Sequence, residues 1–318
     1  MEKMKKKEKK CSVYAAPMEG VTGYIYRNAH WRHFKGIDKY FTPFLTPKQG
    51  KGWTSREKND VAAEHNKGVP VVPQILTNHA GDFVRMASLL QDCGYEEVNL
   101  NLGCPSGTVV SKGKGCGFLR DKEKLLYFFD EIFQKVDVKV SVKTRLGMED
   151  PGEIEELVKI YNRFPLSEVI VHARVRGDFY KKPVNWDAFE KGFLLTDHCM
   201  CYNGDIYAKS DLQRFQDRFP QIDTVMIGRG LIANPQLAET LAGEEARDLK
   251  RWRAFHDEVC LGYEEIMSGE RNVLFKMKEL WSYMLPMFPG AERWGKKIKK
   301  AVCLKDYQEA VNEVFERG

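Results

Sequence analysis

The sequence contains no apolar run long enough to cross a membrane. A membrane-spanning helix needs roughly 18 or more consecutive apolar residues, and no window of the 318-residue chain approaches that length. Six lysines crowd the first ten residues, as at the start of a secretory signal, but the apolar segment that should follow is interrupted by Pro17, Glu19 and Gly20. We therefore expect a cytoplasmic protein with no membrane contact and a basic N-terminal extension over residues 1–10.

Metal-binding and disulfide patterns are also missing. The eight cysteines form no C-x-x-C pair, and no histidine stands at the spacing of a zinc site. In a reducing compartment, isolated cysteines are ordinarily small buried residues. The sequence thus predicts neither a bound metal nor a disulfide framework, and its 43% hydrophobic content is that of a globular protein.

Short β-branched runs alternate with amphipathic segments up to about residue 243. Eight runs have the composition of strands: Ser12–Ala16, Tyr40–Leu45, Val69–Leu76, Glu97–Leu102, Val138–Thr144, Glu168–His172, Met200–Tyr202 and Thr224–Ile227. Apolar residues at helical spacing predict helices over Ala80–Cys93, Asp121–Gln134, Gly152–Phe164 and Ser210–Phe219. This pattern favours an α/β fold, a (β/α)8 TIM barrel over residues 11–243, with a doubly wound sheet as the alternative.

The tail differs from the barrel in pattern and charge. No run after residue 244 has strand composition, so residues 244–318 are predicted to form a small helical domain with a break between residues 286 and 290. Residues 271–305 hold nine lysines and arginines against two acidic residues, with Trp281, Tyr283, Phe288 and Trp294 among them. Such a segment could bind a phosphate backbone and stack on bases. The alternative, favoured by composition alone, is a solvated helix face over an aromatic core.

Side chains capable of chemistry follow seven of the eight predicted strands. A TIM barrel carries its active site at the carboxyl ends of its strands. In chain order these ends carry Pro17, Met18 and Glu19; Gln74; Asn101 and Cys104; Lys143 and Arg145; His172 and Arg174; Asn203-Gly204-Asp205; and Gly228-Arg229-Gly230. The sequence therefore predicts one composite site at the barrel mouth.

Cys104 is the most informative of these residues. Gly103 and Pro105 end the strand before it, so the thiol is displayed in a loop at the strand terminus. On this ground it could be a nucleophile, a metal ligand, a redox switch or simply a small buried side chain. Lys143 could face an electron-rich ring or be an ordinary surface lysine, and His172 could donate a hydrogen bond to a ligand or be structural.

Two glycine-containing ends suggest a phosphate site. Gly228-Arg229-Gly230 precedes a helix predicted to begin near Leu231, and Asn203-Gly204 ends the preceding strand. Backbone amides and an arginine complement a phosphate dianion. A glycine-flanked arginine alone is weak evidence, but the pair of motifs predicts a phosphorylated ligand over the mouth.

Six segments together resemble the signature blocks of the tRNA-dihydrouridine synthases. They occur in order at barrel-strand spacing and cover residues 15 to about 235: Ala16-Pro17-Met18-Glu19-Gly20-Val21-Thr22, Asn101-Leu102-Gly103-Cys104-Pro105, Val142-Lys143-Thr144-Arg145-Leu146-Gly147, Val171-His172-Ala173-Arg174, Asn203-Gly204-Asp205-Ile206 and Met226-Ile227-Gly228-Arg229-Gly230. The resemblance implies an FMN-dependent oxidoreductase that reduces the C5–C6 double bond of specific uridines in tRNA, with NADPH as electron donor.

The resemblance also implies roles for individual residues. Cys104 would be the general acid that protonates C5, a task suited to a thiol because its reference pKa of about 8.5 keeps it protonated at pH 7. FMN would be held by Pro17, Met18, Glu19, Gln74, Lys143, His172, Asn203, Gly204, Asp205, Gly228 and Arg229. The uracil would be faced by Asn101, Arg145 and Tyr180, and the glycine-rich loop after Cys104 could close over the base.

Members of this family carry a basic helical domain that grips tRNA. The resemblance therefore implies that residues 244–318 bind RNA.

The sequence departs from the family pattern at two positions: Gly23 replaces a common aspartate, and Cys116 is an additional cysteine to which we assign no role. The alternatives are an FMN barrel that reduces a free pyrimidine, an rRNA substrate, and a noncatalytic RNA-binding protein. The sequence does not encode an oligomeric state, and we expect a monomer.

Overall fold

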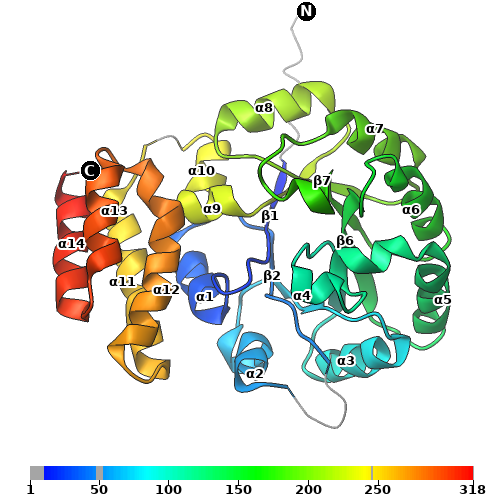
Figure 1. Cartoon of the computed structure of the whole chain (residues 1–318), viewed down its shortest axis with the longest axis horizontal. Helices are drawn as coiled ribbons and strands as arrows, with labels where there is room; N and C mark the ends of the chain where they lie inside the picture. Colours follow the sequence, from blue (N-terminus) through cyan, green and yellow to red (C-terminus); the bar gives the residue numbers. More distant parts are fainter. Residues whose placement is uncertain (1–10, 48–52, 245, 318) are drawn as a thin grey trace, which may run out of the picture.

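The computed structural model describes residues 11–47, 53–244 and 246–317. Its nine named strands are all parallel and form one sheet, which curls into a barrel with helices on the outside (Figure 1). The barrel predicted from the sequence is thus confirmed, and the doubly wound alternative is wrong. The basic extension predicted over residues 1–10 lies outside the described residues.

The two ends of the sheet meet at Pro73, where the barrel closes. Strand β3 (Val71–Val72) pairs with β2 (Lys39–Phe41), whereas β4 (Gln74–Ile75) pairs with β5 (Glu97–Leu102). Pro73 has no N–H to donate to a ladder, so it divides the segment that the sequence predicts as one strand. Counted as one interrupted strand, β3 and β4 complete an eight-membered barrel.

The remaining strands follow the prediction closely. They are β1 (Ser12–Ala15), β6 (Lys139–Gly147), β7 (Val169–Val175), β8 (Met200–Asn203) and β9 (Thr224–Ile227). Strands β6 and β7 each continue three residues beyond their predicted ends and so include Arg145 and Arg174, whereas β1 and β8 differ from the prediction by one residue. The second strand is shorter than predicted, and only Leu45 makes a further bridge, to Ile75.

Helices surround the barrel on its outer face. Those between Tyr24 and Leu241 are α1 (Tyr24–His33), α2 (Ser55–Val61), α3 (Ala80–Asp92), α4 (Gly107–Val110), α5 (Lys122–Phe133), α6 (Glu153–Tyr161), α7 (Trp186–Leu195), α8 (Lys209–Arg218), α9 (Arg229–Ala233) and α10 (Leu237–Leu241), with 3₁₀ turns at η1 (Ala63–His65), η2 (Gly115–Arg120) and η3 (Arg176–Asp178). The four helices predicted from periodicity appear as α3, α5, α6 and α8. Their ends follow local chemistry: the Asp121 carboxylate accepts the Lys124 N–H at 3.0 Å and so begins α5.

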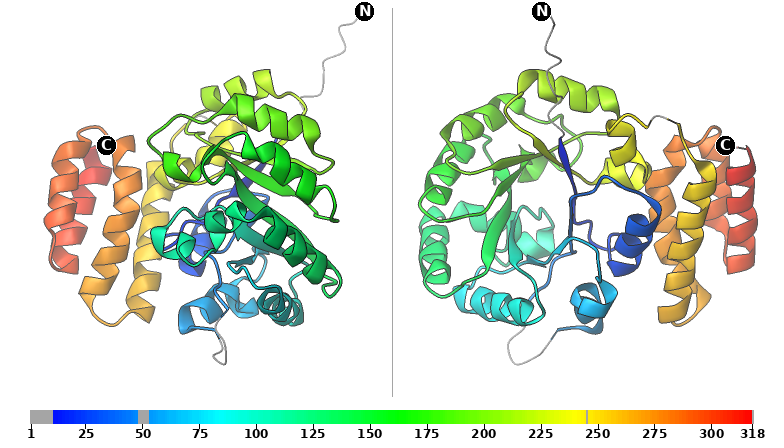
Figure 2. Two further views of the ribbon diagram at one scale, coloured as in Figure 1. Left: turned by 45° about the vertical axis from the view of Figure 1, so that its right-hand side comes forward. Right: turned by 180° about the vertical axis from the view of Figure 1, so that it is seen from behind.

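The tail is helical, as predicted. It consists of α11 (Leu249–Ile266), α12 (Glu270–Met284), η4 (Leu285–Met287), α13 (Ala291–Lys300) and α14 (Leu304–Arg317), which stand beside α1 and α9 at one side of the barrel (Figure 2). Their core continues into the barrel, because Phe255 of α11 packs edge-on against Tyr26 of α1 at 5.5 Å between ring centroids. The two parts therefore share apolar surface, and the domain boundary at residue 243 stays a prediction.

Candidate active site

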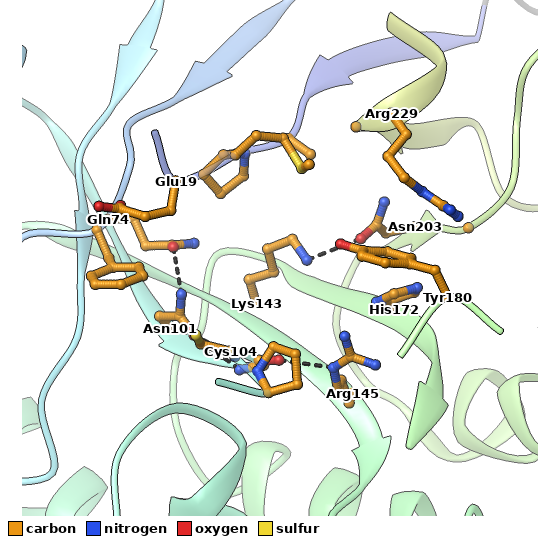
Figure 3. A pocket seen from close by; sticks show the side chains of 18 of the residues that line it. Glu19, Gln74, Asn101, Cys104, Lys143, Arg145, His172, Tyr180, Asn203 and Arg229 are labelled. Atoms are coloured by element: carbon orange, nitrogen blue, oxygen red, sulfur yellow. Dashed lines mark hydrogen bonds between the residues drawn. The ribbon is translucent and has the colours of Figure 1, made fainter. Parts of the chain in front are cut away.

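The fifteen residues predicted for the site line one cavity at the carboxyl ends of the strands (Figure 3). The register explains why they meet: Asn101 pairs with Lys143, Arg145 with His172, and His172 with Asn203. Side chains alternate along a strand, and paired residues of parallel neighbours point the same way. Positions two apart on each strand therefore project into the barrel at successive levels.

Hydrogen bonds to the backbone of Gly103 and Cys104 hold Cys104 at the barrel mouth. The N–H groups of Gly103 and Cys104 donate to Asn101 Oδ1 at 3.1 and 2.9 Å, and the Cys104 carbonyl accepts the Cys116 N–H at 3.1 Å. Gly115 has φ +55°, and a Cβ there would lie 2.9 Å from the Cys104 carbonyl oxygen. The loop is thus closely packed where the thiol sits. Burial raises the pKa of the Cys104 thiol, so it retains its proton at neutral pH.

Cys116 itself is buried, and its side chain does not line the cavity. From the η2 segment its S–H donates to the Gly147 carbonyl at the end of β6, with 3.5 Å between sulfur and oxygen, and burial raises the pKa of its thiol to about 12. What this residue contributes to the site is a backbone N–H, which any amino acid other than proline would supply.

Two amides stand side by side beneath Cys104. Asn101 Nδ2 donates to Gln74 Oε1 at 2.7 Å, and the Gln74 backbone N–H donates to Thr42 Oγ1 at 3.0 Å. Both side chains are buried, Gln74 completely. Asn101 Oδ1 already accepts two N–H groups, so what this amide still offers to a ligand is its second Nδ2–H.

Lys143 lies at the centre of the cavity and donates to Asn203 Oδ1 at 2.9 Å. Burial, and then the neighbouring Arg145, lower the pKa of its ammonium to about 8. The Asn203 amide is fixed in turn, because its Nδ2 donates to the Met226 carbonyl at 2.8 Å. Lys143 is therefore mostly cationic at pH 7 but held in surroundings that do not solvate it fully.

Arg145 and His172 form the wall next to Lys143. Arg145 is almost fully buried and donates from Nε to the Gly103 carbonyl at 2.8 Å and from Nη1 to the Val175 carbonyl at 3.0 Å. It thereby ties β6 to the Cys104 loop. Burial, with the charges of Arg145 and Lys143, lowers the pKa of His172 well below its ordinary value, so the imidazole is neutral at pH 7.

The opposite end of the cavity is built around Asp205. Its carboxylate accepts from Arg174 Nη1 at 3.1 Å and from Arg229 Nη2 at 2.7 Å, while the Arg229 guanidinium lies 3.9 Å from the centre of the Tyr180 ring. Sequence reasoning placed Arg174 at a strand end without a role. The structure gives it one, because Arg174 is buried and orients Asp205.

The glycines at this end of the cavity differ in what a side chain at each position would contact. A Cβ at Gly204 would collide with the Tyr202 hydroxyl, and one at Gly230 would collide with the Ile206 carbonyl. Packing alone therefore requires these two. A Cβ at Gly228 would only make ordinary contact with Ala16 Cβ and Met18 Sδ, each at 3.4 Å. Pro17 and Met18 form an apolar wall of the cavity, and Glu19 beside them pairs with Arg56.

Sequence reasoning missed Pro43, Phe44 and Tyr207, which also line the cavity. The first two were hidden inside the second predicted strand, which in the structure ends at Phe41. Pro43 itself was the available signal, since proline inside a run argues for a strand end. Tyr207 follows the Asn203-Gly204-Asp205 block by two residues and carries no signal of its own.

Most of the four tail aromatic residues singled out in the sequence are not available for stacking. Trp281, Phe288 and Trp294 are all buried, and Tyr283 is half-buried. These three side chains belong to an aromatic core, so base stacking by them is wrong. RNA binding by the tail stays a prediction. The lysines of α13 at positions 296, 297, 299 and 300 are exposed.

The described residues contain neither a metal-binding cluster nor a membrane-spanning helix. Within residues 11–47, 53–244 and 246–317, no group of three or more His, Cys, Asp and Glu side chains could hold a metal ion. Across the same ranges, every helix is too short or too polar to span a bilayer.

Comparison with known structures supports the barrel. Morphinone reductase in complex with tetrahydroNAD is 15% identical, with a TM-score of 0.51 over 74% of this chain and 87% of that one. A variant of NCR from Zymomonas mobilis is 13% identical, with a TM-score of 0.54 over 77% and 93% of the two chains. At such identities these similarities show the fold alone.

Comparison of sequences goes further. A probable tRNA-dihydrouridine synthase of Rhizobium leguminosarum bv. phaseoli is 27% identical over 73% of this chain and 72% of that protein. The tRNA-dihydrouridine(16) synthase of Aquipseudomonas alcaligenes is 27% identical over 74% and 77%, and the tRNA-dihydrouridine(20/20a) synthase of Shewanella oneidensis is 26% identical over 83% and 82%. The family model of dihydrouridine synthase matches residues 14–317. The chain therefore belongs to the dihydrouridine synthase family of oxidoreductases.

Proposed function

We propose that this protein reduces the C5–C6 double bond of uridine in tRNA to 5,6-dihydrouridine, with FMN as cofactor, NADPH as electron donor and Cys104 as proton donor. The observation that carries the proposal is the position of the Cys104 thiol. It lies at the edge of the cavity that also contains Lys143 and Arg229, and its pKa is raised by burial. A tRNA substrate makes the cytoplasm the proposed location.

The residues present fit FMN by the chemistry of their side chains. Donors that suit a polar ring edge line the cavity, with Gln74 and Asn101 at one side and Lys143 at its centre, and Arg229 lies at the other side. Pro17 and Met18 supply apolar lining to the same cavity, and Gly228 next to Met18 adds no side chain to it. Arg229 with the backbone near Gly228 would hold the phosphate. Asp205 would contribute by orienting Arg174 and Arg229, because a carboxylate repels a phosphate dianion.

Bound FMN, once reduced by NADPH, would supply the hydride that adds to C6 of the uracil. Lys143 would face the negative charge that accompanies this transfer, and neutral His172 would offer a hydrogen bond without adding charge. Cys104 would give its proton to C5 from the opposite face, leaving a thiolate that solvent reprotonates. Arg145 would hold the Cys104 loop through the Gly103 carbonyl while its remaining N–H groups face the base.

Substrate recognition would use the mouth and the tail. Tyr180 is 47% exposed and lies over Arg229, so it can stack on a base that has been turned out of the RNA. The exposed lysines of α13 would attract the phosphate backbone. The relatives are named for position 16 or for positions 20 and 20a at almost equal identity. The names therefore do not select a uridine for this chain.

The test is reconstitution with defined RNA. Purified protein is expected to be yellow with bound FMN and to form dihydrouridine in unmodified tRNA when NADPH is present. Mass spectrometry of nuclease fragments would locate the product, with free uridine, UMP and rRNA fragments as parallel substrates. Protein that never retains FMN would contradict the proposal, as would reduction of free pyrimidines in preference to tRNA.

A further inference from the structure

A continuous chain of hydrogen bonds runs through the barrel interior beneath the site. It begins at Asn101, whose Nδ2 donates to Gln74 Oε1 at 2.7 Å. Gln74 Nε2 donates to Asn99 Oδ1 at 2.8 Å, Asn99 Nδ2 to Ser141 Oγ at 2.9 Å, and Ser141 Oγ–H to Glu97 Oε1 at 2.7 Å. The chain uses interior-facing positions of three adjacent strands, β4, β5 and β6. It ends in an ion pair, because Glu97 Oε2 lies 2.7 Å from Lys39 Nζ.

The two ends of this chain determine its direction. At the mouth, Asn101 Oδ1 faces the N–H groups of Gly103 and Cys104, which can only donate. At the floor, the Glu97 carboxylate pairs with the Lys39 ammonium through one oxygen and accepts the Ser141 O–H with the other. Each amide and hydroxyl between these ends can present either a donor or an acceptor, so the ends fix which atom each one presents.

The interior of the chain is sealed from water. Gln74, Asn99 and Ser141 have no exposed surface, and Asn101 is 7% exposed. A mismatch in such a place leaves a donor facing a donor with no solvent to relieve it, which costs more than the loss of one exposed hydrogen bond. A change at one end is therefore transmitted along the chain.

We propose that Glu97 is a positioning residue for Cys104, acting through Ser141, Asn99, Gln74 and Asn101. Glu97 lies four residues before Asn101 on β5, about 13 Å from it at the usual rise of a strand. Its carboxylate keeps the oxygen of Asn101 turned toward the Cys104 loop and the Nδ2–H groups turned toward Gln74 and the cavity. The proposal rests on the proposed function for its consequence in catalysis, but the geometry of the chain does not.

An amide in place of the Glu97 carboxylate would no longer fix the donor-to-acceptor direction of the hydrogen-bond chain. With Glu97→Gln, the side chain can present an N–H to Ser141, and each later member can then reverse. A fully reversed chain would place the Asn101 NH₂ group against the N–H groups of Gly103 and Cys104. The loop would lose two hydrogen bonds and the thiol its fixed position.

The barrel floor supplies a matched control. Glu168 is also buried, accepts from the Tyr14 hydroxyl at 3.2 Å and lies 3.9 Å from the same Lys39 ammonium. Among the described residues its contacts run to Tyr14 and Lys39, away from Asn99 and Gln74. Burial raises the pKa of Glu168 to about 7, so this carboxyl is partly protonated at neutral pH. Glu168→Gln therefore controls for an amide placed beside the same Lys39 without entering the chain.

The first experiment follows Cys104 in protein free of FMN and RNA. Iodoacetamide labelling, read at the Cys104 peptide by mass spectrometry, should be at least about threefold faster in Glu97→Gln and in Ser141→Ala than in the parent, a change of the size one weak hydrogen bond produces. Glu168→Gln should label at the parental rate. Equal labelling rates in Glu97→Gln and Glu168→Gln would overturn the proposal.

A double variant tests whether the two residues act through one chain. Because Glu97→Gln and Ser141→Ala interrupt the same path, the double variant should label no faster than the more affected single variant. Additive effects would mean that the two residues act separately, which also overturns the proposal. Circular dichroism of each variant checks that the fold is intact, and Ser141→Ala, which adds no polar group, serves if Glu97→Gln does not fold.

The second experiment addresses catalysis in the holoenzyme. Single-turnover reduction of uridine in tRNA should slow by about tenfold in Glu97→Gln, the loss expected when a proton donor is misplaced, while flavin reduction by NADPH stays near the parental rate. An unchanged single-turnover rate would overturn the role in catalysis. If the parent forms no dihydrouridine but the labelling pattern is as described, the proposed function has failed and the positioning chain stands.

Discussion

Positive charge gathers at the barrel mouth and on helix α13, and the two groups differ in how they are held. At the mouth, Arg145 and Arg174 are almost completely buried, and each donates to named partners: Arg145 to two backbone carbonyls, and Arg174 to Asp205 and the Lys182 carbonyl. On α13, Lys296, Lys299 and Lys300 are exposed on the side of the helix away from Trp294 and Ile298. The first group is fixed in position and the second is solvated.

This difference in burial indicates that the cations of the mouth and those of α13 have different functions. A buried cation costs desolvation energy and is useful when its exact geometry matters, as beside a reacting ring. Exposed lysines contribute through their number and are screened by salt, as in the binding of a phosphate backbone. We therefore expect changes at the mouth to alter the rate of the chemical step and changes on α13 to alter RNA affinity.

The largest effect should come from Cys104→Ala. Removal of the general acid should lower the single-turnover rate of dihydrouridine formation about 10²- to 10⁴-fold, with FMN binding and its reduction by NADPH retained. Rapid-mixing absorbance would follow the flavin, and mass spectrometry would follow the product. Because burial raises the pKa of the thiol, activity should be lost only as the pH rises above the ordinary range of a cysteine.

Cys116→Ala is the matched control for that experiment. This thiol lies in the η2 segment that holds the Cys104 loop, yet it contacts a carbonyl in the core. Its removal should change the rate by less than about threefold, in line with the weakness of a single S–H···O interaction. Full product formation by Cys104→Ala would show that the barrel mouth acts through its positive charge and not through a positioned proton donor.

Reversal of charge on α13 should have an intermediate effect. Lys296, Lys299 and Lys300 changed together to Glu should weaken tRNA binding at least about tenfold and reduce the salt slope by roughly 0.7 for each phosphate that the variant no longer neutralises. The Michaelis constant should rise while the rate at saturating tRNA stays near the parental value. Lys297 is left in place because it pairs with Glu313.

A second triple variant controls for overall charge. Lys139 at the start of β6, Lys159 on α6 and Arg163 just after α6 are exposed and form no ion pair with any described residue. Helix α6 lies on the side of the barrel away from the tail (Figure 1). Their replacement by Glu changes the net charge by the same amount. If both triple variants lose affinity equally, α13 is not a specific contact surface and its charge acts only through the field of the whole protein.

The fold and most of the cavity could be predicted from the sequence because both depend on local pattern. Strand and helix periodicities predicted the barrel, and the rule that barrel sites lie at strand ends placed fourteen of the fifteen site residues together. Tyr180, the fifteenth, came only from the family resemblance. Pro73 was a visible exception, since a proline in a central strand breaks the ladder. Pro43 was another, and it was overlooked inside a strand predicted three residues too long.

What the sequence could not supply is the register between strands. Glu97 and Ser141 look like ordinary strand residues, and their link to Asn101 exists only because β4, β5 and β6 lie at a particular offset. The same holds for the burial of Trp281 and Trp294. The sequence shows aromatic residues among lysines, and only the packing of α12 to α14 decides which of them face the core.

The smallest expected effect tests the cost of a buried cation directly. Lys143 has a pKa lowered to about 8 in the folded protein, mainly by burial, against about 10.4 when unfolded. The unfolded chain therefore binds this proton more tightly, so the charge destabilises the fold below pH 8, and the penalty is relieved as the pH rises toward 10. Lys143→Met should accordingly stabilise the FMN-free protein by about 1–2 kcal/mol at pH 7, by less at pH 9.5, and weaken FMN binding. Urea denaturation at the two pH values measures this, with Lys159→Met as the exposed control. A Lys143→Met protein that is less stable than the parent at pH 7 would show that the mouth holds its cations at no cost, and the contrast with α13 would then rest on geometry alone.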